Sequence, residues 1–341
     1  MEIITREFKI EPFSSSILDE YFSGRPVCTF DIETQGLDPR RSPVILGGLM
    51  EVSPDGNAFL KQYFLDRPED EHRLITELIK DLNSRDFIVT FNGNRFDVPY
   101  VEKRASKILH EDLTIRPYDL DLYLMVKGYS GIGDLIPSLR QKSLEQYMGF
   151  SSSREDEISG AESIELYYQY LLEEDETKRN AIKEKILLHN SDDVVQLYRL
   201  LPVLLQCDVH KGFLKRGFPV FAPPGDDMIM KVRDIKVGQR KMTVSGTYTG
   251  EAFVYRSFSG IDRIWDAEYD KDRTFKISFP LQKIENQIYI NLLDFFSETD
   301  DFRAYGGYIN DYLILKEDNE YNFRDINHFV KRLLEKTMSG S

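Results

Sequence analysis

Apolar runs with two different periods alternate along the first third of this chain. Three of them are rich in β-branched and aromatic residues, as strands are: residues 27–33, 44–52 and 58–64. The last two flank a Ser-Pro-Asp-Gly-Asn stretch that favours an antiparallel hairpin. Leu and Ile then recur at helical spacing over residues 74–82, an apolar run covers 87–91, and Pro99 suits a first helical turn. This order predicts an α/β fold in which helices flank a mixed sheet.

The pattern changes after residue 205. Residues 142–205 look mainly helical, whereas short period-two segments follow residue 228. A closing helix is indicated by one apolar stripe, which consists of Ile326, Phe329, Val330, Leu333 and Leu334. A chain of 341 residues suits about two domains. We therefore predict a first domain over residues 1–210, a glycine- and proline-rich linker over 211–227, and a smaller β-rich domain over 228–341.

Composition excludes several classes of protein. The longest apolar runs are shorter than the roughly 18 residues of a membrane span, and the N-terminus lacks the apolar stretch of a signal peptide. The two cysteines, Cys28 and Cys207, are too few for a disulfide framework and lack the spacing of a zinc site. We therefore expect a cytoplasmic protein with no membrane partner.

Net charge is uninformative about nucleic acid until the chain is divided. The total is −14, which by itself argues against a polyanionic partner. From Lys211 onward, however, the chain has 20 basic and 20 acidic residues, so the whole excess of acid falls on residues 1–210. Bound divalent ions would offset part of that excess.

Two acids in the first strand indicate a metal site. Asp31 and Glu33 stand two residues apart, so both side chains leave the same face of the sheet. Carboxylates so close repel one another unless a cation lies between them, and oxygen donors suit Mg²⁺ or Mn²⁺. The alternative, a pair of solvated acids on an edge strand, fits poorly because Val27, Phe30 and Ile32 make the run look central.

Two later stretches supply further acids. Asp97 follows an apolar strand and precedes Pro99, where an isolated Asp usually caps a helix. Asp193 falls in a helix expected to begin near Lys185, with His189 one turn before it on the same face. The neighbouring Asp192 points about 100° away, which predicts a surface or supporting position.

Together these stretches resemble the DEDD 3′→5′ exonucleases of the DnaQ-like superfamily, and more closely their YprB-type ribonuclease-H-like group. The first motif of that group matches Asp31, Glu33 and Thr34, and the second matches Asn92, Phe96, Asp97 and Pro99. The third matches Asp193 and Val194 after His189. The resemblance covers roughly residues 25–205. One departure concerns His189: members carry Tyr four residues before the last Asp or His five before it, so its role as base or as water-orienting group stays open.

The resemblance implies a ribonuclease-H-like mixed sheet and a two-metal exonuclease. Asp31, Glu33, Asp97 and Asp193 would bind two Mg²⁺ or Mn²⁺ ions, and His189 would complete the catalytic set. Thr34, Leu37, Asn92 and Phe96 would contact the 3′ end of DNA or RNA, with Leu37 against the terminal base. Asp119 or Asp121 would be structural or supporting. Two alternatives stay open, namely a non-catalytic nucleic-acid-binding module and a metal-dependent endonuclease.

The motifs that carry the resemblance do not extend into the β-rich domain. Its Lys231 and Arg233 share a strand face. Together with Lys236, Arg240 and Lys241 and the nearby Tyr248, Tyr255 and Phe258, they could form a surface that stacks bases and binds phosphate. Basic residues on the outer face of a sheet are more often simply solvated.

Overall fold

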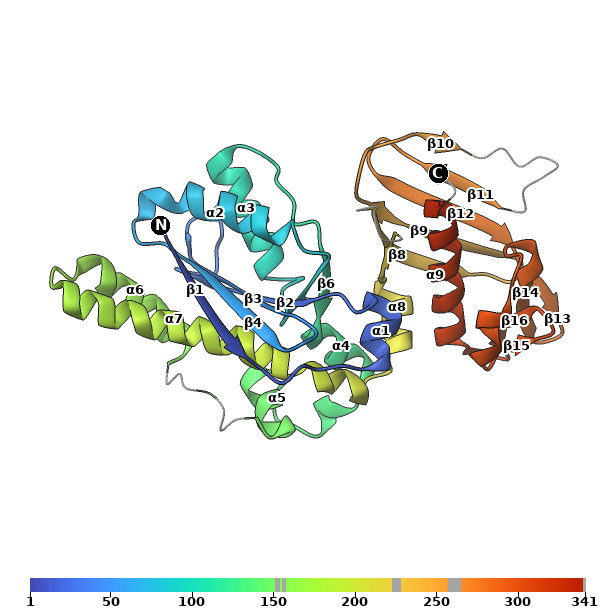
Figure 1. Ribbon diagram of the computed structural model, residues 1–341, viewed down its shortest axis with the longest axis horizontal. Helices are drawn as coiled ribbons and strands as arrows, with labels where there is room; N and C mark the ends of the chain where they lie inside the picture. Colours follow the sequence, from blue (N-terminus) through green and yellow to red (C-terminus); the bar gives the residue numbers. More distant parts are fainter. Residues whose placement is uncertain (151–153, 155–157, 223–227, 257–264, 340–341) are drawn as a thin grey trace. The chain divides into compact units, whose positions relative to one another are not determined.

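Strand β2 (Val27–Thr34) lies inside a six-stranded sheet in the computed structural model of the protein (Figure 1). The strands, in sheet order, are β1 (Glu2–Lys9), β4 (Asn57–Phe64), β3 (Val44–Val52), β2, β5 (Phe87–Thr90) and β6 (Tyr118–Asp121). β2 pairs antiparallel with β3 and parallel with β5, so the sheet is mixed. The predicted α/β fold and the hairpin of β3 and β4 are thus confirmed.

The structure describes residues 1–150, 154, 158–222, 228–256 and 265–339, which belong to two units. The first unit consists of Met1–Asp19 and Ser23–Cys207, and the second of Glu20–Phe22 and Asp208–Ser341. Every helix in the described ranges is too short or too polar to span a bilayer.

Helices pack on both faces of the first unit's sheet. Helix α2 (Glu71–Leu82) covers one face with its predicted apolar stripe, and helix α7 (Glu176–Arg199) covers the other (Figure 1). Two adjacent glycines of β3 allow this close approach. A Cβ on Gly47 would come 2.8 Å from Leu78 of α2, and a Cβ on Gly48 would come 2.0 Å from Oδ1 of Asn190 of α7. Consecutive strand residues face opposite sides of the sheet, so each glycine admits one helix.

The remaining helices of this unit are α3 (Asp97–Leu109), α4 (Leu122–Tyr129), α5 (Gln141–Met148) and α6 (Gly160–Leu172), and short 3₁₀ turns cover Pro68–Asp70, Ile132–Asp134 and Leu201–Gln206. The predicted start of α7 near Lys185 is wrong, because the helix begins at Glu176. Asp175 caps it by accepting hydrogen bonds from the Thr177 and Lys178 amides at 2.9 and 3.2 Å. The first turns of α7 are polar and largely exposed, so the sequence has no apolar stripe there from which the helix could be predicted.

The second unit is β-rich and ends in a helix, as predicted. One sheet has the order β10 (Tyr255–Arg256), β11 (Asp266–Tyr269), β12 (Thr274–Pro280), β9 (Lys241–Tyr248), β8 (Ile229–Val237) and β7 (Pro219–Phe221). The other contains β13 (Gln282–Ile284), β14 (Gln287–Asn291), β16 (Tyr312–Glu317), β15 (Tyr308–Ile309) and β17 (Glu320–Tyr321), and 3₁₀ turns cover Leu292–Asp294 and Asp300–Ala304. Helix α9 (Phe323–Ser339) buries the five stripe residues named above.

Two expectations about this unit need correction. Residues 211–227, expected to be a linker, include most of helix α8 (Val209–Arg216) and all of β7, which pairs with β8. Helix α1 (Ser16–Phe22) also ends in this unit, where the Tyr21 ring lies 4.1 Å from that of Phe213. The predicted stacking and phosphate-binding surface stays a prediction, with one correction: Lys231 and Tyr248 are buried, whereas Arg233, Lys236, Arg240 and Lys241 are exposed. Phe258 lies outside the described residues.

Candidate metal centre

The acids of β2 lie where β2 runs beside β3 and under α7. Asp31 is paired with Gly48 of β3 and Glu33 with Leu46, so the two acids share one face of the sheet. Because Gly48 has no side chain, Asn190 of α7 reaches this face. Its Nδ2 donates to Oδ2 of Asp31 at 3.0 Å, while its Oδ1 accepts from Nε2 of Gln62 at 3.0 Å. The amide is therefore held with its donor group toward Asp31.

Asp97 reaches the same strand from α3. It is the first residue of the helix, and its Oδ1 accepts a hydrogen bond at 3.2 Å from the backbone amide of Ile32. The bond crosses to β2, so Asp97 does more than cap its own helix. Burial raises the pKa of Asp97 to about 7, with a further contribution from Asp119 and Asp121; the bond from Ile32 opposes this shift.

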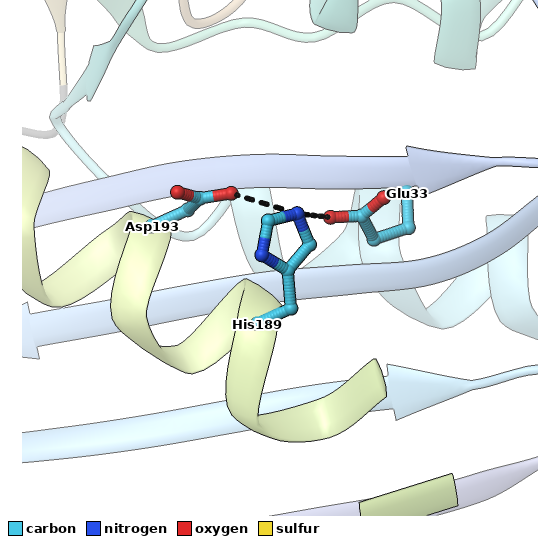
Figure 2. A group of neighbouring side chains, drawn as sticks. All are labelled: Glu33, His189 and Asp193. Atoms are coloured by element: carbon cyan, nitrogen blue, oxygen red, sulfur yellow. Dashed lines mark ion pairs between the residues drawn. The ribbon is translucent and has the colours of Figure 1, made fainter. Parts of the chain in front are cut away.

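His189 lies between two carboxylates. Its Nε2 is 3.5 Å from Oε1 of Glu33 and 3.6 Å from Oδ2 of Asp193, one helical turn further along α7 (Figure 2). The three side chains offer ligand atoms that all lie within 4.8 Å of one another. Glu33 and His189 are buried and Asp193 is partly buried. Three groups from two elements can thus contact one small cation.

The charges of the four predicted acids act on one another. Withdrawal from water raises the pKa of Asp31 well above its usual range, and repulsion from Asp193, Asp97 and Glu33 raises it further. The hydrogen bond from Asn190 offsets only part of this. Glu33 and Asp193 thus belong to the close group around His189, whereas Asp31 and Asp97 lie beside it, on β2 and against the Ile32 amide. Excess negative charge among oxygen donors is what a divalent cation would neutralise, so these residues fit such an ion.

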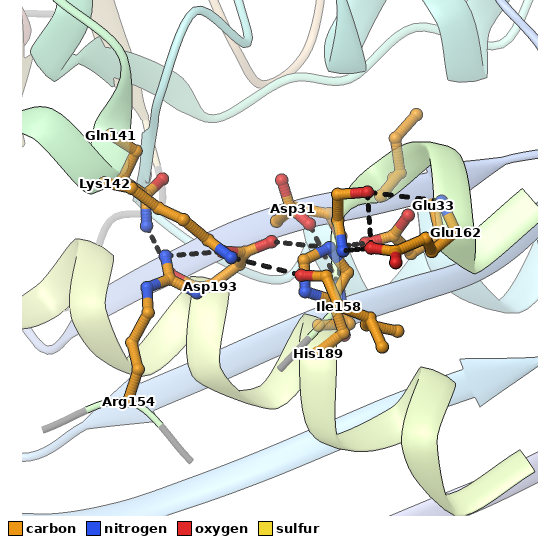
Figure 3. Close-up of polar contacts among 12 residues, drawn as sticks. Asp31, Glu33, Gln141, Lys142, Arg154, Ile158, Glu162, His189 and Asp193 are labelled. Atoms are coloured by element: carbon orange, nitrogen blue, oxygen red, sulfur yellow. Dashed lines mark hydrogen bonds and ion pairs between the residues drawn. The ribbon is translucent and has the colours of Figure 1, made fainter. Parts of the chain in front are cut away.

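Arg154 and Glu145 complete the site, and the sequence did not reveal their part. Nη2 of Arg154 donates to Oδ1 of Asp193 at 2.7 Å (Figure 3). Nε of Arg154 donates to Oε2 of Glu145 at 2.5 Å. Nε2 of Gln141 donates to the backbone carbonyl of Asp193 at 3.0 Å. A buried acid such as Glu145 needs a partner, but no sequence pattern separates Arg154 from a solvated arginine.

The residues predicted to contact substrate differ in exposure and in local role. Leu37 is 84% exposed. Thr34 donates through Oγ1 to the Gly36 carbonyl at 3.0 Å, so it supports the turn after β2. Asn92 has a φ of +66°, consistent with a sharp exit from β5, and the Phe96 ring lies 5.3 Å from that of Tyr100.

Three further acids have supporting positions. Asp119 accepts hydrogen bonds from Thr90 Oγ1 and Asn94 Nδ2, both at 2.7 Å. Asp121 caps α4 by accepting from the Leu124 amide at 3.1 Å. Asp192 is buried, so the expectation of a surface position is wrong, whereas a supporting position remains open.

Comparisons with known proteins bear on the first unit. Residues 28–205, just over half of the chain, match the family model described as the RNase_H superfamily. No curated protein matches the chain. A family B DNA polymerase from the archaeon Pyrobaculum calidifontis is 23% identical, with a TM-score of 0.41, over 53% of this chain and 24% of the polymerase. E. coli exonuclease I in complex with a dT13 oligonucleotide is 11% identical, with a TM-score of 0.37, over 61% of this chain and 55% of the exonuclease.

An exonuclease I from Methylocaldum szegediense is 15% identical, with a TM-score of 0.34. There the alignment covers 64% of this chain and 54% of the exonuclease. The chain thus spans little more than half of either exonuclease and about a quarter of the polymerase.

Proposed function

The chain belongs to the ribonuclease H superfamily, and from that premise we propose that it is a divalent-metal-dependent nuclease. One observation supports this above all. Asp31, Glu33, Asp97 and Asp193 come from three elements, and burial together with repulsion from the other three acids raises the pKa of Asp31. A purely structural role would not require four carboxylates held against their own repulsion. A binding module without activity is therefore the weaker interpretation.

The ions that suit this site are Mg²⁺ or Mn²⁺, because carboxylate oxygens dominate the donor set. When bound, two such ions would stabilise the charge on the phosphoryl group and acidify a water. The four carboxylates would hold them. Within the protein, Asn190 orients Asp31 and the amide of Ile32 orients Asp97, so two of the four ligands have fixed directions before any ion arrives.

His189 is the group suited to move a proton. Its Nε2 lies between Glu33 and Asp193, which would stabilise the imidazolium once a proton is accepted. We assign it the role of general base toward the attacking water. The proton would leave the water for Nε2 as the water oxygen bonds to phosphorus and the 3′ oxygen of the chain departs.

We further propose that cleavage proceeds from the 3′ end of DNA or RNA. The support is the match of the three motifs to 3′→5′ exonucleases, together with the exposure of Leu37, where a terminal base would pack. This part of the proposal concerns polarity, which the metal ligands alone do not determine.

The test uses 5′-labelled single- and double-stranded DNA and RNA incubated with Mn²⁺, with the Asp31→Asn protein as control. A ladder of shortened 5′-labelled products would support an exonuclease that starts from the 3′ end. Short 5′-labelled fragments already present at the earliest times, or cleavage of circular substrates, would indicate an endonuclease. Binding of these substrates without hydrolysis by the wild-type protein would contradict the nuclease proposal and favour the binding module.

A further inference from the structure

Arg154 contacts a predicted metal ligand yet is almost enclosed by protein. Its side chain is 8% exposed and forms an ion pair with Asp193 (Figure 3). It forms a second ion pair with Glu145, whose side chain is 1% exposed. We propose that Arg154, held by Glu145, is a positioning residue that fixes the Asp193 carboxylate for metal binding. The inference rests on the proposed function, because it assigns Asp193 to the metal.

The contact geometry supports positioning. Two nitrogens of Arg154 bind Glu145, with Nε at 2.5 Å from Oε2 and Nη2 at 2.6 Å from Oε1. The same Nη2 binds Oδ1 of Asp193 at 2.7 Å. A planar guanidinium held on one edge by a carboxylate cannot rotate freely, so the direction of its bond to Asp193 is determined.

The contact leaves half of the Asp193 carboxylate available. Arg154 takes Oδ1, while Oδ2 faces Nε2 of His189 at 3.6 Å, beside Glu33. Asp193 is also held at its backbone, where Gln141 donates to the carbonyl oxygen at 3.0 Å. One oxygen is therefore anchored and the other is directed to the place where the ligand atoms converge.

The charge of Glu145 explains how a cation can be tolerated beside a metal site. Burial by itself would lower the pKa of the Arg154 guanidinium, but the bonds to Glu145 and the charge of Asp193 raise it, so it stays charged. Glu145 neutralises that charge locally. The pair thus presents an N–H group to Asp193 without adding a net positive charge that would repel a divalent ion.

Arg154 cannot itself serve as a phosphate-binding arginine in this arrangement. Its Nε and Nη2 groups already bind two carboxylates, and its side chain is shielded from solvent. Two other roles would be compatible with the same contacts. In the first, Arg154 only stabilises the chain between α5 and α6. In the second, it is a cation that competes with the metal for Asp193. These roles predict different effects on metal affinity.

The experiment measures Mn²⁺ binding by the full-length chain, through the EPR signal of free Mn²⁺ and the Mn²⁺-dependent shift of the melting temperature. Glu145→Gln keeps the shape of the side chain but removes one of the two carboxylates that compensate the Arg154 charge, so that Asp193 alone balances it. Arg154→Lys keeps the charge but loses the planar fork. Arg85→Lys is the matched control, because Arg85 also bridges two carboxylates, those of Glu51 and Asp81.

We expect Glu145→Gln and Arg154→Lys each to weaken Mn²⁺ binding by about 10- to 100-fold, the usual effect of removing a group that orients a metal ligand. Arg85→Lys should leave Mn²⁺ affinity unchanged. Wild-type affinity in both site variants, whatever their melting temperature, would mean that the pair only stabilises the chain between α5 and α6. Tighter binding in Arg154→Lys would identify a competing cation, and weakening in Glu145→Gln alone would indicate a charge effect without positioning. Each of these results overturns the proposal.

The same measurements separate this inference from the proposed function. If the wild-type protein binds no Mn²⁺, both fail together. If it binds Mn²⁺ with the expected dependence on Arg154 and Glu145 but hydrolyses no nucleic acid, positioning stands and the nuclease proposal fails. If the wild-type protein hydrolyses nucleic acid but Mn²⁺ affinity is unchanged in the Arg154 and Glu145 variants, only the proposed positioning role is wrong.

Discussion

Asp31 has a negative charge that the folded protein disfavours without a metal. Burial is the main cause that raises the pKa of Asp31, and repulsion from Asp193, Asp97 and Glu33 raises it further. Asp31→Asn should therefore abolish hydrolysis and leave the melting temperature in EDTA at pH 7.5 equal to or above that of the wild type. Calorimetry and the nuclease assay check this, with the exposed Glu111→Gln as control. Retained activity, or a clear loss of stability, would contradict the assignment.

His189 differs from the usual pattern of its relatives, so its role needs a separate test. If Nε2 accepts the proton, His189→Gln should lower kcat by roughly 10²- to 10⁴-fold at saturating Mn²⁺ without changing the Mn²⁺ concentration at half-saturation. His189→Tyr should keep partial activity, because the resembling exonucleases use Tyr at this spacing. Near-normal turnover of His189→Gln would reduce the residue to packing or water orientation. A shifted Mn²⁺ midpoint would make it a ligand.

Asp97 makes stability depend on pH in a direction opposite to that of an ordinary salt bridge. Its pKa rises from 3.8 to about 7 on folding, so its protonated form favours the folded state. The stabilisation is complete below about pH 4 and is lost as pH rises toward about 7. In EDTA, the melting temperature of Asp97→Asn minus that of the wild type should therefore increase from about pH 4 to about pH 7. Above that range the difference should stay constant. A gain that shrinks with rising pH would contradict the shift.

Mn²⁺ should reverse that difference, because the ion binds the deprotonated carboxylate. We expect the wild-type protein to gain stability from Mn²⁺ most strongly above about pH 7, whereas Asp97→Asn should gain little at any pH. Differential scanning fluorimetry at several pH values measures both curves.

At the scale of elements, the two glycines of β3 decide how closely the helices approach. A Cβ on Gly48 would overlap Asn190, which orients Asp31. Gly48→Ala should therefore cost about 1–3 kcal/mol of stability, as overpacking usually does, and should also weaken Mn²⁺ binding. Gly128→Ala in α4 is the control: a Cβ there meets nothing within 4 Å, so stability should be unchanged or higher by up to about 1 kcal/mol. If Gly48→Ala is destabilised but its Mn²⁺ affinity is unchanged, Asn190 is not needed to orient Asp31 for metal binding.

At the scale of the whole molecule, the proposed metal ligands all belong to the first unit. A chain ending at Cys207 should therefore bind Mn²⁺ within a few-fold of the full-length affinity, while its KM for nucleic acid should change more than its kcat. Tyr21 and Phe22 would lose their partners in the second unit, so the truncated chain should carry Tyr21→Ser and Phe22→Ser. A folded truncated protein that cannot bind Mn²⁺ would show that the first unit does not hold the metal by itself.

Local patterns in the sequence were enough to predict most elements of the first unit and the last helix of the second. Strand β2, the hairpin, α2 and α9 carry their apolar residues at the spacing of one buried face, and the acids of β2 follow from the same period. The beginning of α7 and the strand β7 were missed for the opposite reason. The first is a solvated helix with no stripe, and the second is a three-residue strand inside a stretch rich in Gly and Pro.

The sequence by itself therefore determined the ribonuclease-H-like fold and the identity of the acids, because periodicity and short motifs are local properties. Only the tertiary structure decided what surrounds those acids. Asn190 reaches Asp31 because Gly48 lets α7 approach β3, and Arg154 reaches Asp193 from a separate segment that no spacing rule connects to it. The electrostatic environment of a carboxylate depends on every charge within a few ångströms, and the chain brings those charges together only when it folds.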